Sequence, residues 1–210
     1  MKILVVAATR AELTGMYAYF GLPEEDFVQT DRFDILISGV GMTATAFALG
    51  RYSSNNYQLV VNLGIAGCYD RSVPLGTLLQ ITTDQFSELG AEDKDEFIPI
   101  ETLGFGKSTY KAVNTVQNES LRGLRKVHGI TVNKVHGNKQ SIQTVVARLH
   151  PVTESMEGAA VFYACEHTST DCLQVRSISN YVEERNRDSW KIGLAIKNLN
   201  DWAIEFLTNS

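Results

Sequence analysis

Five short segments of the chain are almost continuously apolar, and they predict strands that are buried on both faces. They are rich in valine, isoleucine and leucine, and most of them end at glycine or a small polar residue. Runs of this kind are typical of parallel sheets that helices cover on both sides. The segments are residues 3–8, 35–38, 59–63, 78–82 and 173–178.

Stretches between and after these segments carry apolar residues at helical spacing. We expect helices at 11–20, 43–52, 109–115, 157–167 and 189–207, the last with a broad apolar face. Strands that alternate with helices indicate βαβ units. The sequence therefore predicts one α/β domain over residues 1–210: a three-layer αβα sandwich around a largely parallel mixed central sheet.

Composition and charge narrow the classes of function. The 210 residues carry a net charge of −5, so nucleic acid and anionic membranes are not expected partners. No stretch approaches the roughly 20 apolar residues of a membrane span, and the apolar residues 1–8 are too short for a signal peptide. We expect a cytoplasmic protein with three buried, reduced thiols at Cys68, Cys165 and Cys172, which have no metal-ligand spacing.

The turns that follow the predicted strands are where candidate chemistry is expected, because ligands of such sheets bind beyond the carboxyl ends of the strands. Glu12 follows the first strand, Gly39-Val40-Gly41 the second, Ile65-Ala66-Gly67 the third and Ser179-Asn180 the last. Singly, each has an ordinary explanation: a glutamate in the first turn of a helix, or an asparagine that closes a turn. Their shared place at one rim of the sheet favours a common site.

A cofactor site is not indicated by the glycine turns. Residues 39–44 place glycines between a strand and a helix, as dinucleotide-binding turns do. However, the next strand ends at Asn62-Leu63-Gly64, with no acidic residue for a ribose, so we favour a turn that borders a different pocket. We expect neither an organic cofactor nor a metal. Four histidines lack ligand spacing and are expected on the surface or in turns: His128, His136, His150 and His167.

Two later segments are the most specific in the chain: Ser155-Met156-Glu157-Gly158-Ala159-Ala160 and Arg176-Ser177-Ile178-Ser179-Asn180. With Glu12 and the glycine turns, they resemble the active-site set of the nucleoside phosphorylase/nucleosidase superfamily, above all the methylthioadenosine/adenosylhomocysteine nucleosidases. The resemblance runs almost from end to end and is poorest over 93–129. It implies an N-glycosyl hydrolase that acts on a small nucleoside without metal or cofactor, and a homo-oligomer, dimeric or larger.

The resemblance also implies a role for individual residues. Glu12 would orient and deprotonate the attacking water. Glu157 would accept hydrogen bonds from the ribose hydroxyls and stabilise an oxocarbenium-like sugar, and Met156 would pack beneath the ribose. The other residues expected to bind substrate are Val40, Ile65, Ala66, Gly67, Ser155, Ser179 and Trp190.

Asn180 stands where the adenine-specific nucleosidases have an aspartate. An asparagine is no general acid at neutral pH, but its NH₂ group can donate to O6 or N7 of a 6-oxopurine. We therefore expect release of hypoxanthine or guanine rather than adenine. A site built to hydrogen-bond one base leaves its buried polar atoms unpaired when a different base binds.

The run 179–187, which leads into Trp190, is similar to the futalosine hydrolases of menaquinone biosynthesis. That resemblance implies cleavage of futalosine to hypoxanthine and dehypoxanthinyl futalosine. Trp190 would cover the benzoate-bearing arm of such a substrate, and Arg10, Lys139 or Arg187 would meet its carboxylate.

Three alternatives stay open at this point. They are a methylthioadenosine-type nucleosidase, a 6-oxopurine nucleoside phosphorylase and, from a different class, a non-catalytic nucleoside-binding protein. Glu12 favours hydrolysis over phosphorolysis, because a carboxylate beside the nucleophile repels phosphate and suits the activation of water. Glu12 and Glu157 together argue against a pure binder, which needs no water-activating carboxylate.

Overall fold

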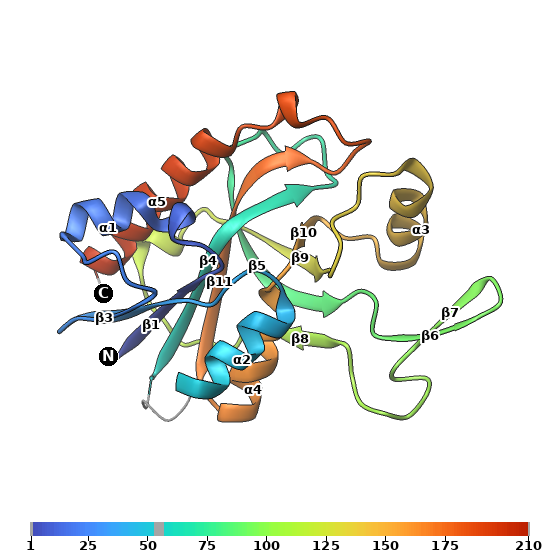
Figure 1. The fold of residues 1–210 in the computed structure, drawn as a ribbon, viewed down its shortest axis with the longest axis horizontal. Coiled ribbons are helices and arrows are strands. Elements are labelled where there is room, and N and C mark those ends of the chain that lie inside the picture. The colour runs from blue at the N-terminus through green and yellow to red at the C-terminus, as the bar shows by residue number, and fades with distance from the viewer. Residues whose placement is uncertain (1, 53–56, 210) are drawn as a thin grey trace.

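A mixed sheet forms the middle layer of the computed structural model, which describes residues 2–52 and 57–209 (Figure 1). Residues 1 and 210, the ends of the predicted domain, lie outside the described residues. Among the described residues the sheet has nine strands in the order β10-β9-β5-β11-β4-β1-β3-β2, with β8 paired to β5. The strands are β1 Ile3–Ala7, β2 Phe27–Gln29, β3 Phe33–Ile37, β4 Leu59–Cys68, β5 Leu78–Phe86, β8 Thr109–Lys111, β9 Arg125–Thr131, β10 Thr153–Ser155 and β11 Asp171–Tyr181.

The pairing confirms a mixed and largely parallel sheet. β1 is parallel to β3 and β4, β11 is parallel to β4, and β9 is parallel to β5 and β10, whereas β2, β8 and the β5–β11 pair are antiparallel. β10 also pairs antiparallel with β4, with Glu154 opposite Gly67. Because β10 bonds to both β9 and β4, the sheet closes on itself there and brings the segments after β4, β9 and β10 together.

Helices cover both faces of the sheet, as the apolar runs predict. Ile3 and Val5 of β1 face a core formed with α1 (Thr14–Phe20) and α5 (Ile192–Thr208). Leu4 and Val6 face the opposite core, formed with α2 (Met42–Tyr52) and α4 (Gly158–Thr168). Figure 1 shows α1 beside α5 and α2 beside α4. The three-layer αβα prediction is confirmed.

The predicted helix at 109–115 is wrong. Thr109–Lys111 forms β8, an edge strand antiparallel to β5. Tyr110 is buried there, with its ring edge-on to Phe86 and Tyr163. β5 supplies hydrogen-bond partners along its edge, and a tyrosine flanked by threonine suits a pleated, half-buried surface. The pairing with β5 therefore determined the secondary structure of this segment, whose apolar residues show only weak helical spacing.

Several other boundaries differ from the sequence-based prediction. The last helix begins at Ile192, after a short 3₁₀ turn at Arg187–Ser189, and not at residue 189. Besides β8, five strands and one helix of the described chain were not predicted: β2, β9, β10, the hairpin of β6 (Gly90–Asp93) and β7 (Glu96–Pro99), and α3 (Lys139–Leu149). The hairpin extends from the body as an arm (Figure 1). In the described part of the chain, no helix is both long and apolar enough for a membrane span.

Candidate active site

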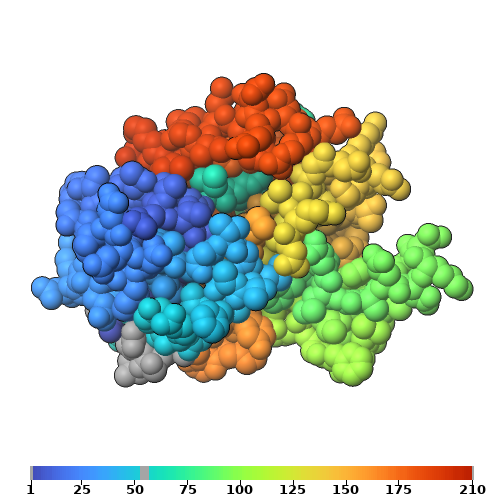
Figure 2. All heavy atoms as spheres, viewed as in Figure 1, coloured from blue at the N-terminus to red at the C-terminus, as the bar shows by residue number. Residues whose placement is uncertain are grey.

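A cavity of about 310 Å³ lies at the carboxyl ends of β1, β4 and β11. Figure 2 shows atoms of β4 between the C-terminal segment and the N-terminal segments, where the surface is hollowed. Most of the predicted site residues line this cavity: Glu12, Val40, Ile65, Ala66, Gly67, Ser155, Met156, Glu157 and Ser179. The structure also adds residues that were not predicted: Ala8, Thr9, Ala11, Val135, Glu154, Ile192 and Ile196.

The two remaining predicted residues, Asn180 and Trp190, line a smaller neighbouring cavity of about 50 Å³. Gly67, Val135 and Glu154 line both cavities, so the two spaces adjoin. The candidate site therefore has two parts. The larger part holds the predicted water-activating and ribose-binding carboxylates, Glu12 and Glu157, and the smaller holds the predicted base-reading amide of Asn180.

Glu12 lies in the 3₁₀ turn Arg10–Leu13 that follows β1. Its Oε2 accepts hydrogen bonds from the backbone N–H and the hydroxyl of Thr9, each at 3.0 Å, and its Oε1 accepts from the N–H of Ile65 at 3.1 Å. Burial raises the pKa of Glu12, while Ile65, Arg176 and Thr9 lower it and the charge of Glu157 raises it. Three donors thus fix the orientation of this carboxylate at the cavity wall.

Arg176 lies behind Glu12 and is fully buried in β11. Its Nη2 donates to Oδ1 of Asn62 at 2.6 Å, and its charge lowers the pKa of Glu12. A Cβ atom on Gly64 would lie 2.5 Å from Nη1 of Arg176 and 3.0 Å from Oε1 of Glu12. Gly64 therefore leaves the space in which the guanidinium and the carboxylate approach each other. This role of Arg176 was not predicted, although an arginine inside an apolar strand is a signal that the sequence offers.

Glu157 is the N-cap residue of α4 and is only 9% exposed. Its Oε1 accepts a hydrogen bond from the N–H of Gly41 at 2.9 Å. Gly41 has φ +94°, a conformation that side-chain-bearing residues rarely adopt, so the glycine turn after β3 serves to aim this N–H at the carboxylate. The turn borders the cavity through Val40, as expected.

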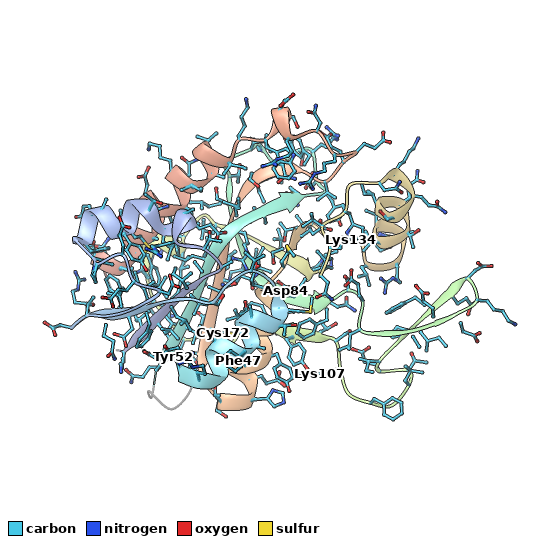
Figure 3. All side chains as sticks on the ribbon, viewed as in Figure 1. Phe47, Tyr52, Asp84, Lys107, Lys134 and Cys172 are labelled. Atoms are coloured by element: carbon cyan, nitrogen blue, oxygen red, sulfur yellow. The ribbon has the colours of Figure 1, made fainter. Side chains whose placement is uncertain are left out.

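A buried network under the start of α4 holds Glu157 in place. Asp84 accepts hydrogen bonds from Thr131 at 2.9 Å and from Gln174 at 2.9 Å, and Thr131 in turn accepts from the N–H of Ala159 at 2.7 Å. Burial raises the pKa of Asp84 to about 6. A Cβ atom on Gly158 would lie 2.1 Å from Oδ2 of Asp84, so only glycine fits above the network. Figure 3 shows Asp84 inside the molecule.

Asn180 lies at a bulge in β11, where the pairing with β4 shifts between Ile178 and Asn180. The hydroxyl of Ser179 donates to Oδ1 of Asn180 at 2.8 Å, and Nδ2 donates to the carbonyl of Tyr181 at 3.0 Å. A Cβ atom on Gly67 would lie 3.3 Å from Nδ2. Each half of the amide keeps further hydrogen-bonding capacity for a ligand, since NH₂ has two hydrogens and the oxygen two lone pairs.

The cations proposed for the substrate carboxylate do not line either cavity. Arg10 donates to the carbonyl of Glu24 at 2.6 Å and to Asp26 at 3.2 Å, Lys139 begins α3, and Arg187 lies over the Trp190 ring. Among the described residues, Arg185 is the only arginine or lysine that lines the smaller cavity, and its guanidinium carbon lies 5.3 Å from the centre of the Trp190 ring.

His136 lies in the connection between β9 and α3, and its side chain lines the smaller cavity. The side chain is 12% exposed. Glu154 accepts hydrogen bonds from the N–H of His136 at 2.9 Å, from its Nδ1, and from the hydroxyl of Tyr69 at 2.6 Å. Among the described residues, no group of three or more histidine, cysteine, aspartate or glutamate side chains is arranged so that it could hold a metal ion.

Comparison with known proteins identifies relatives of the chain. Residues 34–207 match the family model of the phosphorylase superfamily. The chain is 30% identical to a futalosine hydrolase of Streptomyces coelicolor, and the match covers 96% of this chain and 93% of that relative. A futalosine hydrolase of Acidothermus cellulolyticus is 33% identical over 79% of this chain and 71% of its own length.

Solved structures share the fold. The futalosine hydrolase of Helicobacter pylori superposes with a TM-score of 0.81 at 17% identity, covering 100% of this chain and 98% of that one. The 5′-methylthioadenosine/S-adenosylhomocysteine nucleosidase of the same organism, solved with butyl-thio-DADMe-Immucillin-A, superposes with a TM-score of 0.74 at 19% identity. The match covers 99% of this chain and 95% of that one. At these identities the likeness shows the fold alone.

Proposed function

The chain belongs to the phosphorylase superfamily and, within it, to the futalosine hydrolases, and we propose that it hydrolyses the N-glycosidic bond of futalosine. It is an N-glycosyl hydrolase of nucleosides. The proposed products are hypoxanthine and dehypoxanthinyl futalosine, and the proposed setting is menaquinone biosynthesis in the cytoplasm. Residues 1–210 are proposed to form one nucleosidase domain.

The observation that carries the proposal is the placement of Glu12 and Glu157 in one cavity. Glu12 is proposed to accept a proton from the attacking water, and Glu157 to hold the ribose hydroxyls while positive charge develops on the sugar. Among the described residues that line this cavity, none is lysine or arginine. Phosphate needs a cation to bind beside two carboxylates, so the lining favours water as the nucleophile over phosphate.

Base and arm recognition are proposed for the smaller cavity. Asn180 is proposed to read O6 or N7 of hypoxanthine, and its neighbour Ser179 to orient the amide. Trp190, with Arg185 beside it, is proposed to border the carboxylate-bearing arm at the 5′ end of the ribose. Ile65, Ala66, Gly67, Val40, Ser155 and Met156 are proposed to enclose the sugar and base.

A homodimer is proposed from the apolar surface beside α2 and α4. Phe47 of α2 is 69% exposed and Tyr163 of α4 is 41% exposed. They lie near an apolar cavity of about 410 Å³, lined in part by Met42, Phe86 and Tyr163. Figure 3 labels Phe47 on α2. A second copy would cover this surface, as contiguous exposed apolar area commonly marks an interface.

Product analysis by chromatography and mass spectrometry tests the proposed function. Purified protein is given futalosine, inosine and methylthioadenosine separately, each with and without phosphate. We expect hypoxanthine from futalosine without phosphate, and no turnover by Glu12→Gln, although this variant still binds substrate. Adenine release from methylthioadenosine alone, strictly phosphate-dependent cleavage, or full activity of Glu12→Gln would each overturn the proposal.

A further inference from the structure

Cleavage of a nucleoside needs a proton for the departing base. The electron pair of the broken N-glycosidic bond moves onto the purine, and a purine anion leaves poorly unless an acid protonates it. Asn180 has no proton that it can give up at neutral pH. Glu12, assigned above to the water, acts on the opposite side of the reacting carbon. The proposed function therefore lacks a proton donor for the base.

His136 occupies the part of the site where such a donor is required. It lines the same small cavity as Asn180 and Gly67. Its neighbour in the chain, Val135, lines both this cavity and the larger one. Figure 3 places Lys134 on the connection between β9 and α3 that carries this histidine. That connection is tied to the segment after β11 by a backbone hydrogen bond from Arg185 to Gly137 at 3.3 Å.

Glu154 holds the imidazole of His136 in one orientation. The carboxylate is only 4% exposed and accepts from the backbone N–H and the Nδ1 of His136, with the hydroxyl of Tyr69 as a third donor. Nδ1 is therefore committed to Glu154. No described residue makes a hydrogen bond to Nε2, so that atom is available to a ligand in the cavity. A carboxylate behind one ring nitrogen and a ligand at the other is an arrangement that suits proton transfer.

We propose that His136, held by Glu154 and Tyr69, is the catalytic acid that protonates the leaving purine. This inference rests on the proposed function. As the bond between C1′ and the purine nitrogen breaks, its electron pair moves into the purine and Nε2–H of the imidazolium gives its proton to a ring nitrogen of the base. Water adds to C1′ and loses a proton to Glu12. The net reaction consumes one water, and proton exchange with solvent returns both residues to their starting states.

The charged and titratable groups around His136 come from three elements. Glu154 belongs to β10, Tyr69 follows β4, and Glu183 and Arg185 follow β11 and line the same cavity. The pKa of Tyr69 is raised, chiefly by burial and then by the charge of Glu154, so its hydroxyl stays protonated and remains a donor to Glu154. The immediate partner of the imidazole is thus a carboxylate that two neutral donors also hold.

The test compares two leaving groups in His136→Gln, which keeps hydrogen-bonding ability but carries no transferable proton. On futalosine we expect kcat/KM to fall by about 100-fold or more. On N7-methylated futalosine, whose base leaves without protonation, we expect a loss of less than about threefold by the same reasoning. The matched control is His167→Gln, an exposed histidine outside both cavities, which should behave as wild type on both substrates.

An equal loss on both substrates, or no loss on futalosine, would overturn the role of His136. If wild type does not cleave the methylated substrate, His136→Ala decides instead: rescue of futalosine cleavage by added imidazole supports the inference, and absence of rescue rejects it. A wild-type protein that cleaves neither futalosine nor its methylated form would overturn the proposed function itself, which keeps the two failures distinct.

Discussion

The backbone N–H of Gly41 donates a hydrogen bond to Oε1 of Glu157 at 2.9 Å, and so joins the start of α2 to the start of α4. The bond occupies one carboxylate oxygen and fixes the plane of the group. The other oxygen keeps its acceptor capacity for the hydroxyls of a bound sugar. One N–H aimed by a glycine turn therefore prepares the carboxylate before substrate arrives, which lowers the ordering required in the reaction.

Glu157→Gln should reduce kcat by about 10²–10³-fold, because the amide keeps the shape of the side chain but removes the negative charge that stabilises the sugar cation. The bond from Gly41 can persist to the amide oxygen, so folding should be retained. Steady-state kinetics on futalosine measure the effect. Glu166→Gln, on the exposed end of the same helix, is the control, and wild-type activity in Glu157→Gln would remove Glu157 from the sugar site.

Thr9→Val should move the acid limb of the pH profile to higher pH. The pKa of Glu12 is raised by burial, and the Thr9 hydroxyl is one of the groups that lowers it. A base must be ionised to act, so activity is present above the pKa of Glu12 and lost as the pH falls through it. Removing a donor raises that pKa further. Profiles of kcat/KM against pH test this, with the exposed Thr144→Val as control, and an unshifted limb would contradict the assignment of Glu12.

Asn180→Asp should exchange the base preference. An aspartate can accept from the exocyclic amine of adenine and can carry a proton, whereas it repels O6 of hypoxanthine. We expect at least about a tenfold loss on futalosine and a gain on methylthioadenosine of similar size. Competition assays with both substrates give the ratio. Asn186→Asp serves as the control in the adjoining loop, and an unchanged ratio in Asn180→Asp would mean that another group reads the base.

Asp84→Asn should gain stability relative to wild type as the pH rises. The pKa of Asp84 is raised to about 6 in the folded protein, so the folded state favours the protonated carboxyl. Its favourable contribution is present below the ordinary aspartate pKa and is lost as the pH rises through about 6. Urea unfolding of both proteins at pH 5 and pH 8 measures the difference. A gap between variant and wild type that does not change with pH would show that Asp84 is not protonated in the folded protein.

Local sequence was sufficient for five strands of the sheet, β1, β3, β4, β5 and β11, and for the helices α1, α2, α4 and α5 that cover its faces. The unbroken apolar runs of β1, β4 and β11 reflect burial on both faces, which is a property of each strand by itself. Glu12, Asn180 and the glycine turns were predicted at one rim of the sheet because parallel strands share the direction of their carboxyl ends. The same logic failed for Tyr110, whose strand exists only because β5 offers it an edge.

The residues that were missed depend on contacts between distant segments. Thr131 binds both Asp84 and the N–H of Ala159 in the first turn of α4. Arg176 reaches the vicinity of Glu12 through the space left by Gly64. Nothing in the spacing of β5, β9 and β11 shows that they meet under one helix. His136 was missed for a related reason: Glu154, its partner, was one residue outside the segment that carried the resemblance. The closure of the sheet through β10 brings the two together.

The bulge in β11 lies beside Asn180, the residue proposed to read the base, and it separates the choice of base from the chemistry on the sugar. No residue of β4 lies opposite Ser179 in the register of the described strands, yet the pairing resumes at once, with Asn180 opposite Gly67 and Tyr181 opposite Cys68. The backbone on either side is therefore held independently of what the side chain at 180 is. A lineage can alter the base that it excises by substitution at one position while the carboxylates that act on the sugar stay under separate selection, so new nucleoside preferences are accessible from this scaffold by short mutational paths.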